Sequence, residues 1–166
     1  MFSVKVAVRV RPFNGREKDR NAKCIIEMNG PATKIRNPEE PKAEPKNFAF
    51  DFSYWSHDGC VDNNGYMEAA AGSNYASQQK VFDDLGAGVL KNAYEGYNTS
   101  LFAYGQTGAG KSYSMVGYGV NKGIVPITCD NLFQHIGKTD DGTKFEVKFS
   151  MLEIYFVPFF YFCSLN

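Results

Sequence analysis

Three glycines, a lysine and a serine fall close together in the segment Gly105-Gln106-Thr107-Gly108-Ala109-Gly110-Lys111-Ser112. A chain of phosphates presents several anionic oxygens, and backbone N–H groups reach them only where no Cβ atom blocks the approach. Glycine also adopts the positive φ angles that such a loop needs. Lys111 adds a positive charge, and the Ser112 hydroxyl is an oxygen ligand of the kind that Mg²⁺ prefers. The segment therefore predicts a site for a phosphorylated ligand.

The same segment fits the pattern G-x-x-x-x-G-K-[ST] of the P-loop, which normally follows a strand and opens a helix. Thr99–Tyr104, read TSLFAY, is a short apolar run that suits a buried central strand directly before the loop. We expect Lys111 to contact the β- and γ-phosphates and Ser112 to bind Mg²⁺, with the start of a helix facing the phosphates. The alternative is a glycine-rich loop with an exposed lysine that binds nothing.

Periodic patterns predict the elements that would position this loop. Valines at every second position predict a strand over Ser3–Arg11, which Pro12 ends because proline has no N–H to donate. Other alternating or helical patterns predict strands over Cys24–Met28, Thr33–Arg36, Phe48–Trp55 and Phe145–Met151, helices over Gln78–Tyr94 and Val125–Ile136, and exposed loops over Asn37–Lys46 and His57–Asn74. Strands alternating with helices predict an α/β domain around a central mixed sheet.

Glycines and a proline mark the ends of the two predicted helices. Gly96 is well placed to end the first helix, and Gly86 and Gly88 weaken it by about 1 kcal/mol each. Pro126 should open the second helix, which Gly137 should close.

The amino-acid composition limits the kinds of partner and the cellular compartment that we expect for this protein. The 166 residues suit one domain, and eighteen basic residues balance eighteen acidic ones, so we expect no contact with nucleic acid or membrane. The four cysteines lie far apart and outside metal-ligand spacing, which favours reduced thiols over disulfides or zinc. The N-terminus lacks the continuous apolar stretch of a signal peptide. We therefore expect a cytoplasmic protein.

Other polar residues suggest no further site. His57 and His135 are isolated in the sequence, so each fits a surface or packing histidine better than a ligand. Asp83-Asp84 and Asp140-Asp141 are adjacent pairs whose side chains diverge on a helix, which favours solvated carboxylates over an acid/base pair. Asp83 and Asp84 also belong to DDLGAG, which we interpret as helix and not as a nucleotide switch.

The sequence segments around the loop resemble those of a known protein family. FAYGQTGAGKSYSMVG resembles the nucleotide loop of kinesin motor domains, and SVKVAVRVRPFNGREKD resembles the first strand of that domain. FDFSYWSHD, SQQKVFDDLG, AYEGYNTSLFAYGQ, GIVPITCDNLF and FSMLEIY follow in the family's order, so the resemblance covers residues 3–155. SYWSHD and GAGKSY are most similar to the kinesin-3 subfamily. One departure is the loop from Gly59 to Asn74, which is longer than most relatives carry.

The resemblance implies a fold, a ligand and site residues. It implies a partial P-loop NTPase fold with ATP and Mg²⁺ as cofactors and, for a complete motor, the microtubule as partner and location. Arg9, Arg11 and Pro12 match the segment that kinesins lay against the adenine and ribose, and Tyr113 matches the aromatic on the other side of the base. A guanidinium and a flat ring suit stacking on a base. Without the resemblance, Arg9 and Arg11 would be interpreted as the solvent face of an edge strand.

The sequence resemblance to the family ends near Tyr155. Kinesins continue with an N-x-x-S-S-R segment and a D-L-A-G-x-E segment that sense the γ-phosphate, and neither motif occurs here. We therefore expect residues 1–155 to be the N-terminal half of a motor domain. Residues 156–166 form an aromatic tail too short to span a bilayer, best explained by a missed splice site or a truncated gene model, with a functional tail as the alternative. Cys163 stands at a prenylation position, but terminal Asn166 fits poorly.

Two functions of different classes remain open. The first is an enzyme, the ATP-binding part of a kinesin-like microtubule motor, for which we assign no catalytic residue within this chain. The second is a non-catalytic module that binds nucleotide without turnover. A different P-loop NTPase, such as a small kinase, lacks recognisable lid arginines here.

Overall fold

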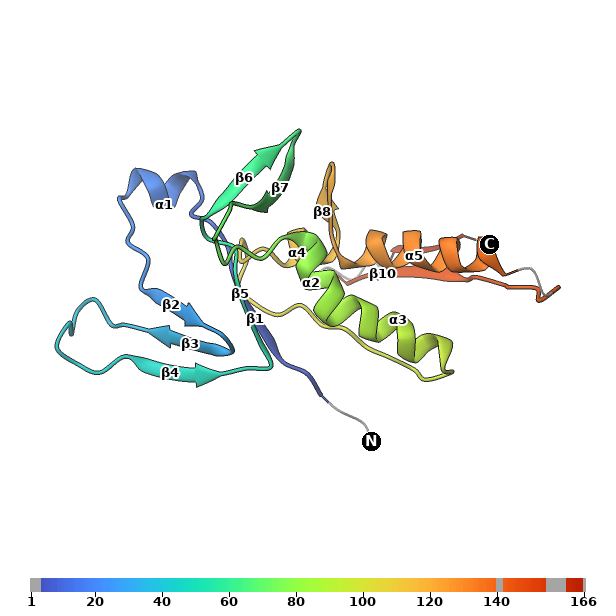
Figure 1. The fold of residues 1–166 in the computed structure, drawn as a ribbon, viewed down its shortest axis with the longest axis horizontal. Coiled ribbons are helices and arrows are strands. Elements are labelled where there is room, and N and C mark those ends of the chain that lie inside the picture. Colours follow the sequence, from blue (N-terminus) through green and yellow to red (C-terminus); the bar gives the residue numbers. More distant parts are fainter. Residues whose placement is uncertain (1–3, 140–141, 155–160, 166) are drawn as a thin grey trace. The chain divides into compact units, whose positions relative to one another are not determined.

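The computed structural model describes residues 4–139, 142–154 and 161–165. It divides into two compact units, Met1–Asp130 and Asn131–Asn166, and α5 begins in the first and ends in the second. The chain contains both strands and helices, which confirms the α/β class (Figure 1). The elements are β1 (Ala7–Val10), α1 (Gly15–Asp19), β2 (Ile26–Asn29), β3 (Ala32–Ile35), β4 (Lys46–Ala49), β5 (Phe52–Trp55), β6 (Cys60–Asn63), β7 (Tyr66–Ala69), α2 (Gln78–Val81), η1 (Phe82–Gly86), α3 (Ala87–Tyr94), α4 (Lys111–Met115), β8 (Gly117–Tyr118), β9 (Asn121–Lys122), α5 (Ile124–Lys138), β10 (Phe149–Glu153) and β11 (Tyr161–Leu165).

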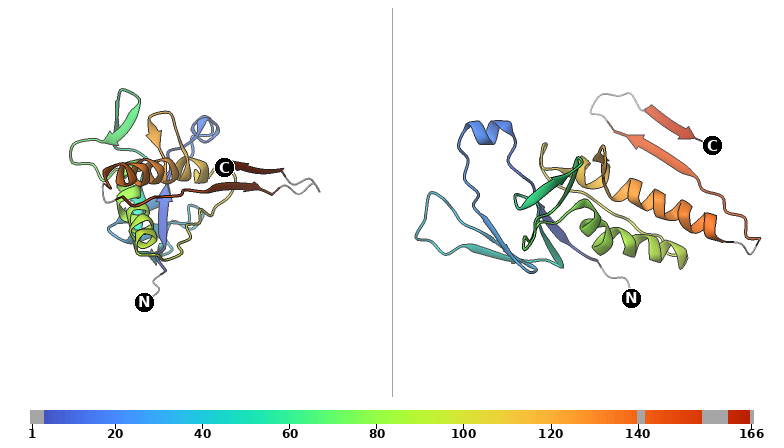
Figure 2. Two further views of the ribbon diagram at one scale, coloured as in Figure 1. Left: turned by 90° about the vertical axis from the view of Figure 1, so that its right-hand side faces the viewer. Right: turned by 45° about the horizontal axis from the view of Figure 1, so that its top comes forward.

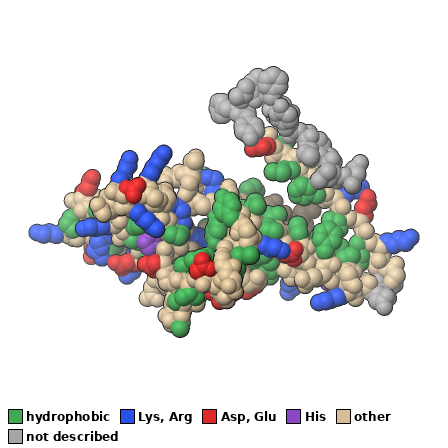
Figure 3. Space-filling view, turned by 90° about the horizontal axis from the view of Figure 1, so that it is seen from above, with side chains coloured by type: hydrophobic (Ala, Val, Ile, Leu, Met, Phe, Trp, Pro, Cys, Tyr) green, Lys and Arg blue, Asp and Glu red, His purple; other side chains and the backbone are tan. Residues whose placement is uncertain are grey.

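The described strands form five small sheets, where we expected one central sheet. In the first unit β1 pairs with β5 in parallel, β2, β3 and β4 form an antiparallel sheet, and β6–β7 and β8–β9 are hairpins. Figure 3 shows lysine and arginine side chains gathered over the end of this unit that carries α1 and β2–β4, with acidic side chains among them.

The predicted strand over Phe48–Trp55 is two strands with different partners. Its first half belongs to β4 and pairs with β3, whereas its second half is β5 and pairs with β1. The chain changes sheets at Phe50 and Asp51, where the Phe50 N–H bonds to the carbonyl of Pro31 and the Asp51 N–H bonds to that of Val6. Alternation alone could not locate this break, because both halves keep the same period.

The predicted loop over His57–Asn74 contains the hairpin β6–β7. Its turn is Asn64-Gly65, and both residues have positive φ angles, 52° and 85°. Asn-Gly is the preferred pair for a two-residue hairpin turn of this hand. The Asn-Gly signal for a hairpin therefore lies within the stretch that the sequence predicts as an exposed loop.

The predicted helix over Gln78–Tyr94 is confirmed as one continuous rod of α2, η1 and α3 (Figure 2). The Ser77 hydroxyl caps its start by accepting the Lys80 N–H, and Gly96 with a φ of 83° follows its end. The middle turns widen to a π-helix at Phe82–Gly86. The ring of Phe82 occupies the space that a Cβ atom on Gly86 would fill.

The segment Thr99–Tyr104 is not a strand, contrary to our prediction. Leu101 packs against the core, but Phe102 and Tyr104 are 88% and 101% exposed. A strand is held by hydrogen bonds to neighbouring strands, and among the described residues none pairs with this segment.

The core of the first unit lies between the β1–β5 pair, the α2–α3 rod and the start of α5. Phe52 and Tyr54 of β5 stack with ring centroids 5.9 Å apart. The buried residues of this hydrophobic cluster are Tyr54, Ala76, Val81, Phe82, Ile124 and Ile127. These contacts fix the strand that carries Arg9 against the helices that flank the glycine-rich loop.

The second unit contains the antiparallel pair β10–β11 and the end of α5. α5 confirms the second predicted helix, but it starts one residue before Val125 and runs through Gly137 instead of stopping there. β10 begins at Phe149, later than the predicted Phe145, because it forms only where β11 pairs with it. In the predicted tail, residues 156–160 and 166 lie outside the described residues, and residues 161–165 form β11. No helix in the described part of the chain is both long and apolar enough to cross a membrane.

Candidate functional site

The glycines of the P-loop segment adopt the conformations that their positions require. Gly105, Gly108 and Gly110 have φ angles of 151°, 80° and 99°, which residues with a side chain rarely adopt. A Cβ atom on Gly105 would also lie 3.0 Å from the Cβ of Ala109. The helix α4 begins directly after Gly110, at Lys111. The loop geometry thus explains why these three positions are glycines.

The ammonium of Lys111 lies against the carbonyls of its own loop. Its Nζ donates to the oxygen of Gly105 at 2.7 Å and to the oxygen of Gln106 at 3.0 Å. Carbonyl oxygens carry partial negative charge, and these two oxygens therefore stabilise the positive charge of the Lys111 ammonium. A phosphate group bound here would compete with these carbonyls for the ammonium.

The other loop residues predicted for the site are accessible. Gln106, Thr107, Gly108 and Ser112 are exposed, and Ala109 is half-buried. Ser112 occupies the first turn of α4, next to Lys111. Its hydroxyl can supply one oxygen to Mg²⁺, an ion that takes its other ligands readily from phosphate and water. Among the described residues no group of three or more acidic, histidine or cysteine side chains could hold a metal by itself.

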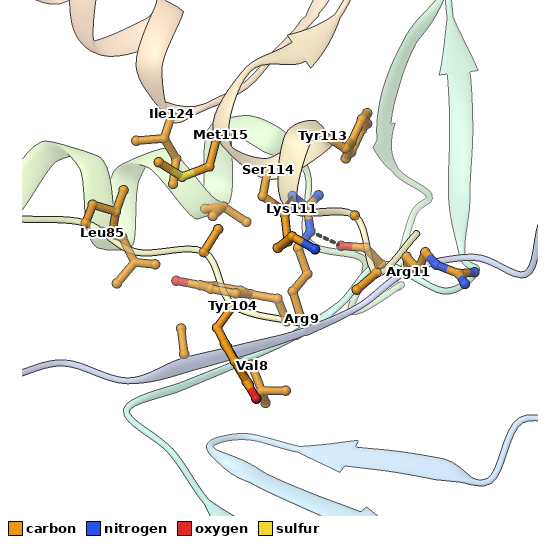
Figure 4. Close-up of a pocket in the computed structure, with 18 of the residues that line it drawn as sticks. Val8, Arg9, Arg11, Leu85, Tyr104, Lys111, Tyr113, Ser114, Met115 and Ile124 are labelled. Carbon is orange, nitrogen blue, oxygen red and sulfur yellow. Dashed lines mark hydrogen bonds between the residues drawn. The ribbon is translucent and has the colours of Figure 1, made fainter. Parts of the chain in front are cut away.

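Arg11 links the loop to the N-terminal helix. Its Nε donates to the carbonyl of Gly108 at 2.6 Å, and its two terminal nitrogens donate to the carboxylate of Glu17 at 2.7 and 2.8 Å. These bonds from Arg11, with the backbone N–H of Asn14, lower the pKa of Glu17 to about 2. The carbonyl of Pro12 accepts a further bond from Arg11. The Arg11 side chain points away from Lys111 (Figure 4).

Arg9 is half-buried, and its guanidinium is surrounded by acceptors. Its guanidinium donates to Ser56 Oγ at 2.9 Å, Gln78 Oε1 at 2.6 Å, Ser114 Oγ at 3.1 Å and the carbonyl of Ala76 at 3.3 Å. Burial lowers its pKa, although the neighbouring Tyr113 opposes that shift. The alternative that Arg9 belongs to a solvent-exposed face is therefore wrong.

The four residues predicted to contact the base, Arg9, Arg11, Pro12 and Tyr113, line one cavity together with Lys111. The guanidinium carbon of Arg9 is 5.3 Å from the ring centroid of Tyr113, so these two side chains contact each other. Tyr113 also lies 6.0 Å from Tyr118, centroid to centroid. Pro12 is exposed and next to Arg11. The adenine contacts of Arg9, Arg11, Pro12 and Tyr113 remain predictions.

Gln78 is a buried residue of the site that we did not predict. It is 2% exposed; its oxygen accepts from Arg9, and its Nε2 donates to the carbonyls of Tyr113 at 2.6 Å and Asn121 at 3.3 Å. It therefore ties the helix that follows the loop to α2. The signal was a glutamine at the start of a helical face that continues with Val81 and Leu85 at helical spacing.

A cavity of about 440 Å³ lies beside Lys111, in the range typical of ligand pockets. Its lining is mainly apolar and includes Val8, Leu85, Met115 and Ile124, with Arg9 and Lys111 among its polar members (Figure 4). Gly110 and Lys111 belong to both the cavity wall and the loop. Ala109 lines it too, whereas the other five residues of the loop, Gly105–Gly108 and Ser112, do not.

Comparison with known proteins identifies the family. The family model described as the kinesin motor domain matches residues 9–157. The chain belongs to the kinesin motor domain family. It is 51% identical over 155 residues to the kinesin-like protein KIF28 of Rattus norvegicus and 51% identical over 156 residues to KIF1A of the same organism, each match covering 92% of this chain. These matches span 15% and 9% of the two relatives.

Solved kinesin structures confirm the fold. KIF14 bound to ADP in complex with a microtubule superposes with a TM-score of 0.69 at 33% identity, covering 99% of this chain and 49% of that one. A KIF14 dimer with AMP-PNP on a microtubule gives a TM-score of 0.70 at 34% identity. The matches to KIF1A, KIF1B and KIF1C confirm the predicted kinesin-3 resemblance. The chain thus spans about half the length of these solved kinesin chains.

Proposed function

We propose that this kinesin-family chain binds Mg-ATP, with the phosphates held by the loop Gly105–Ser112. The observation that carries the proposal is the loop itself, in which three glycines with positive φ lead directly into α4 at Lys111. Backbone N–H groups bind the phosphate oxygens, and Lys111 leaves the carbonyls of Gly105 and Gln106 to neutralise part of the phosphate charge. Mg²⁺ would reduce the charge repulsion between the phosphates, and Ser112 would supply one of its ligands.

The substitution Lys111→Ala tests the site. It removes a charge-assisted contact with the phosphates, for which we expect a loss of about 1.5–3 kcal/mol in binding free energy, or roughly ten- to 150-fold in Kd. The measurement is a titration of the chain with a fluorescent Mg-ADP analogue. The matched control is Lys23→Ala, which removes the same charge from an exposed position far from the loop in the sequence. Equal affinity for wild type and Lys111→Ala would show that the site is misplaced.

We propose further that the complete protein is a microtubule motor that couples ATP hydrolysis to movement. The support is the family membership and the KIF14 structures, in which the motor is bound to a microtubule. The test is ATP hydrolysis by a longer chain that continues through the two γ-phosphate-sensing segments of kinesins. Microtubules should stimulate that hydrolysis, and an unchanged rate would contradict the motor assignment.

The second candidate is nucleotide binding without turnover by the 166-residue chain. It is favoured by one observation: neither the N-x-x-S-S-R nor the D-L-A-G-x-E pattern occurs in this sequence. Charge stabilisation at the γ-phosphate carries most of phosphoryl-transfer catalysis, so a chain without these residues should hold nucleotide and hydrolyse little of it. Hydrolysis by this chain that Lys111→Ala abolishes would contradict this candidate.

A further inference from the structure

The P-loop is held in place from outside by a side chain of a distant segment. The carbonyl of Gly108, in the middle of the loop, accepts a hydrogen bond of 2.6 Å from Arg11 Nε. Arg11 and Gly108 are 97 residues apart in the sequence. The bond fixes the direction in which the peptide group after Gly108 points, and therefore the direction of the N–H that belongs to it.

The orientation of the Arg11 guanidinium depends on Glu17. Both terminal nitrogens of Arg11 donate to the Glu17 carboxylate, at 2.7 and 2.8 Å. Such a two-point pairing fixes the plane of a guanidinium as well as its position. With that plane fixed, the remaining Nε–H is directed at Gly108.

The carboxylate of Glu17 is itself held. Its Oε2 accepts the backbone N–H of Asn14 at 2.8 Å, and the Asn14 side chain accepts the backbone N–H of Glu17 at 2.9 Å. This capping box opens α1 and fixes Glu17 at the third position of that helix. A chain of hydrogen bonds thus runs from α1 through Glu17 and Arg11 to the loop.

We propose that Glu17 is a positioning residue for phosphate binding, acting through Arg11 on the carbonyl of Gly108. The inference rests on the proposed function and adds to it a residue outside the P-loop. Glu17 does not contact the phosphates. It keeps the carbonyl of Gly108 bonded to Arg11 and so holds the shape of the loop, and its loss therefore weakens binding of every ligand that the loop holds.

The test compares Glu17→Gln with Asp19→Asn, which removes the same charge from the same short helix. We expect Glu17→Gln to weaken binding of the fluorescent Mg-ADP analogue by about two- to fivefold, the range for a partly exposed charged pair, and Asp19→Asn to leave it unchanged. Competition by inorganic pyrophosphate should weaken by the same factor, because the loop and not the base is affected. Thermal unfolding of each variant shows whether it remains folded.

A double-mutant cycle separates positioning from general destabilisation. In the Arg11→Ala background, Glu17→Gln should cause no further loss, because its effect passes through Arg11. Equal losses with and without Arg11, or wild-type affinity in folded Glu17→Gln, would overturn the inference while leaving the proposed site intact. If wild type and Lys111→Ala bind Mg-ADP equally, the proposed function fails instead. A loss for Mg-ADP without a loss for pyrophosphate would place the effect at the base and would also overturn the inference.

Discussion

Arg9 and Arg11 are separated by a single residue, yet their side chains serve different parts of the molecule. Arg9 turns inward to Gln78, Ser56 and Ser114 and joins the first strand to the helices. Arg11 turns to Glu17 and the loop carbonyl of Gly108. In an extended segment, residues two apart point to the same face. The different partners of Arg9 and Arg11 therefore come from the residues that surround each side chain and not from strand alternation.

The shifted pKa of Glu17 predicts how stability depends on pH. Its pKa falls from an ordinary value of 4.5 to about 2, so the carboxylate contributes stability above pH 4.5 that is lost as the pH falls toward 2. Arg11 and, more weakly, His57 are the cationic groups that favour its charged form. Wild type should therefore be more stable than Glu17→Gln near pH 5, and the difference should shrink as the pH falls from 4.5 to 2. Urea unfolding of both proteins across that range measures it, and a constant difference would contradict the assignment.

At the scale of elements, the sequence predicted the features that depend on residues close together in the chain. The helix over Gln78–Tyr94 was predictable from its apolar face and Gly96, and the loop glycines from the phosphate pattern. The irregular conformation of Thr99–Tyr104 was not predictable, because an apolar run cannot show whether a partner strand lies beside it. The hairpin at Asn64-Gly65 was predictable from its turn residues, but each of its flanking strands is only four residues long.

Gly86 and Gly88 provide a matched pair in the α2–α3 rod. A Cβ on Gly86 would lie 2.4 Å from Cδ2 of Phe82, whereas nothing lies within 4 Å of one on Gly88. We expect Gly86→Ala to lower the free energy of unfolding by about 1–3 kcal/mol, because the core must shift to admit the methyl group. Gly88→Ala should raise it by roughly 0.5–1 kcal/mol, since alanine favours the helix. Urea unfolding of the two variants checks the pair, and two stabilised proteins would show that the rod is packed differently.

At the scale of the whole molecule, the candidate site draws on residues scattered through the first unit. The P-loop was predictable from one contiguous segment, and the family resemblance added Arg9, Arg11, Pro12 and Tyr113. The sequence could not reveal that Gln78 joins Arg9 to the helix after the loop, because its partners lie far away in the chain. Contacts between distant segments depend on the folded arrangement, which no local pattern encodes.

The central claim is that the amides between Gly105 and Ser112 bind the phosphates of a nucleotide, with Lys111 neutralising part of their charge. The most direct test is a ¹H–¹⁵N NMR titration of the chain with Mg-ADP, which follows every backbone amide at once. The account predicts that the largest shifts fall on the amides of residues 105–112 and that they vanish in Lys111→Ala. Loop amides that stay unchanged while a cluster of shifts appears elsewhere in the chain would contradict it.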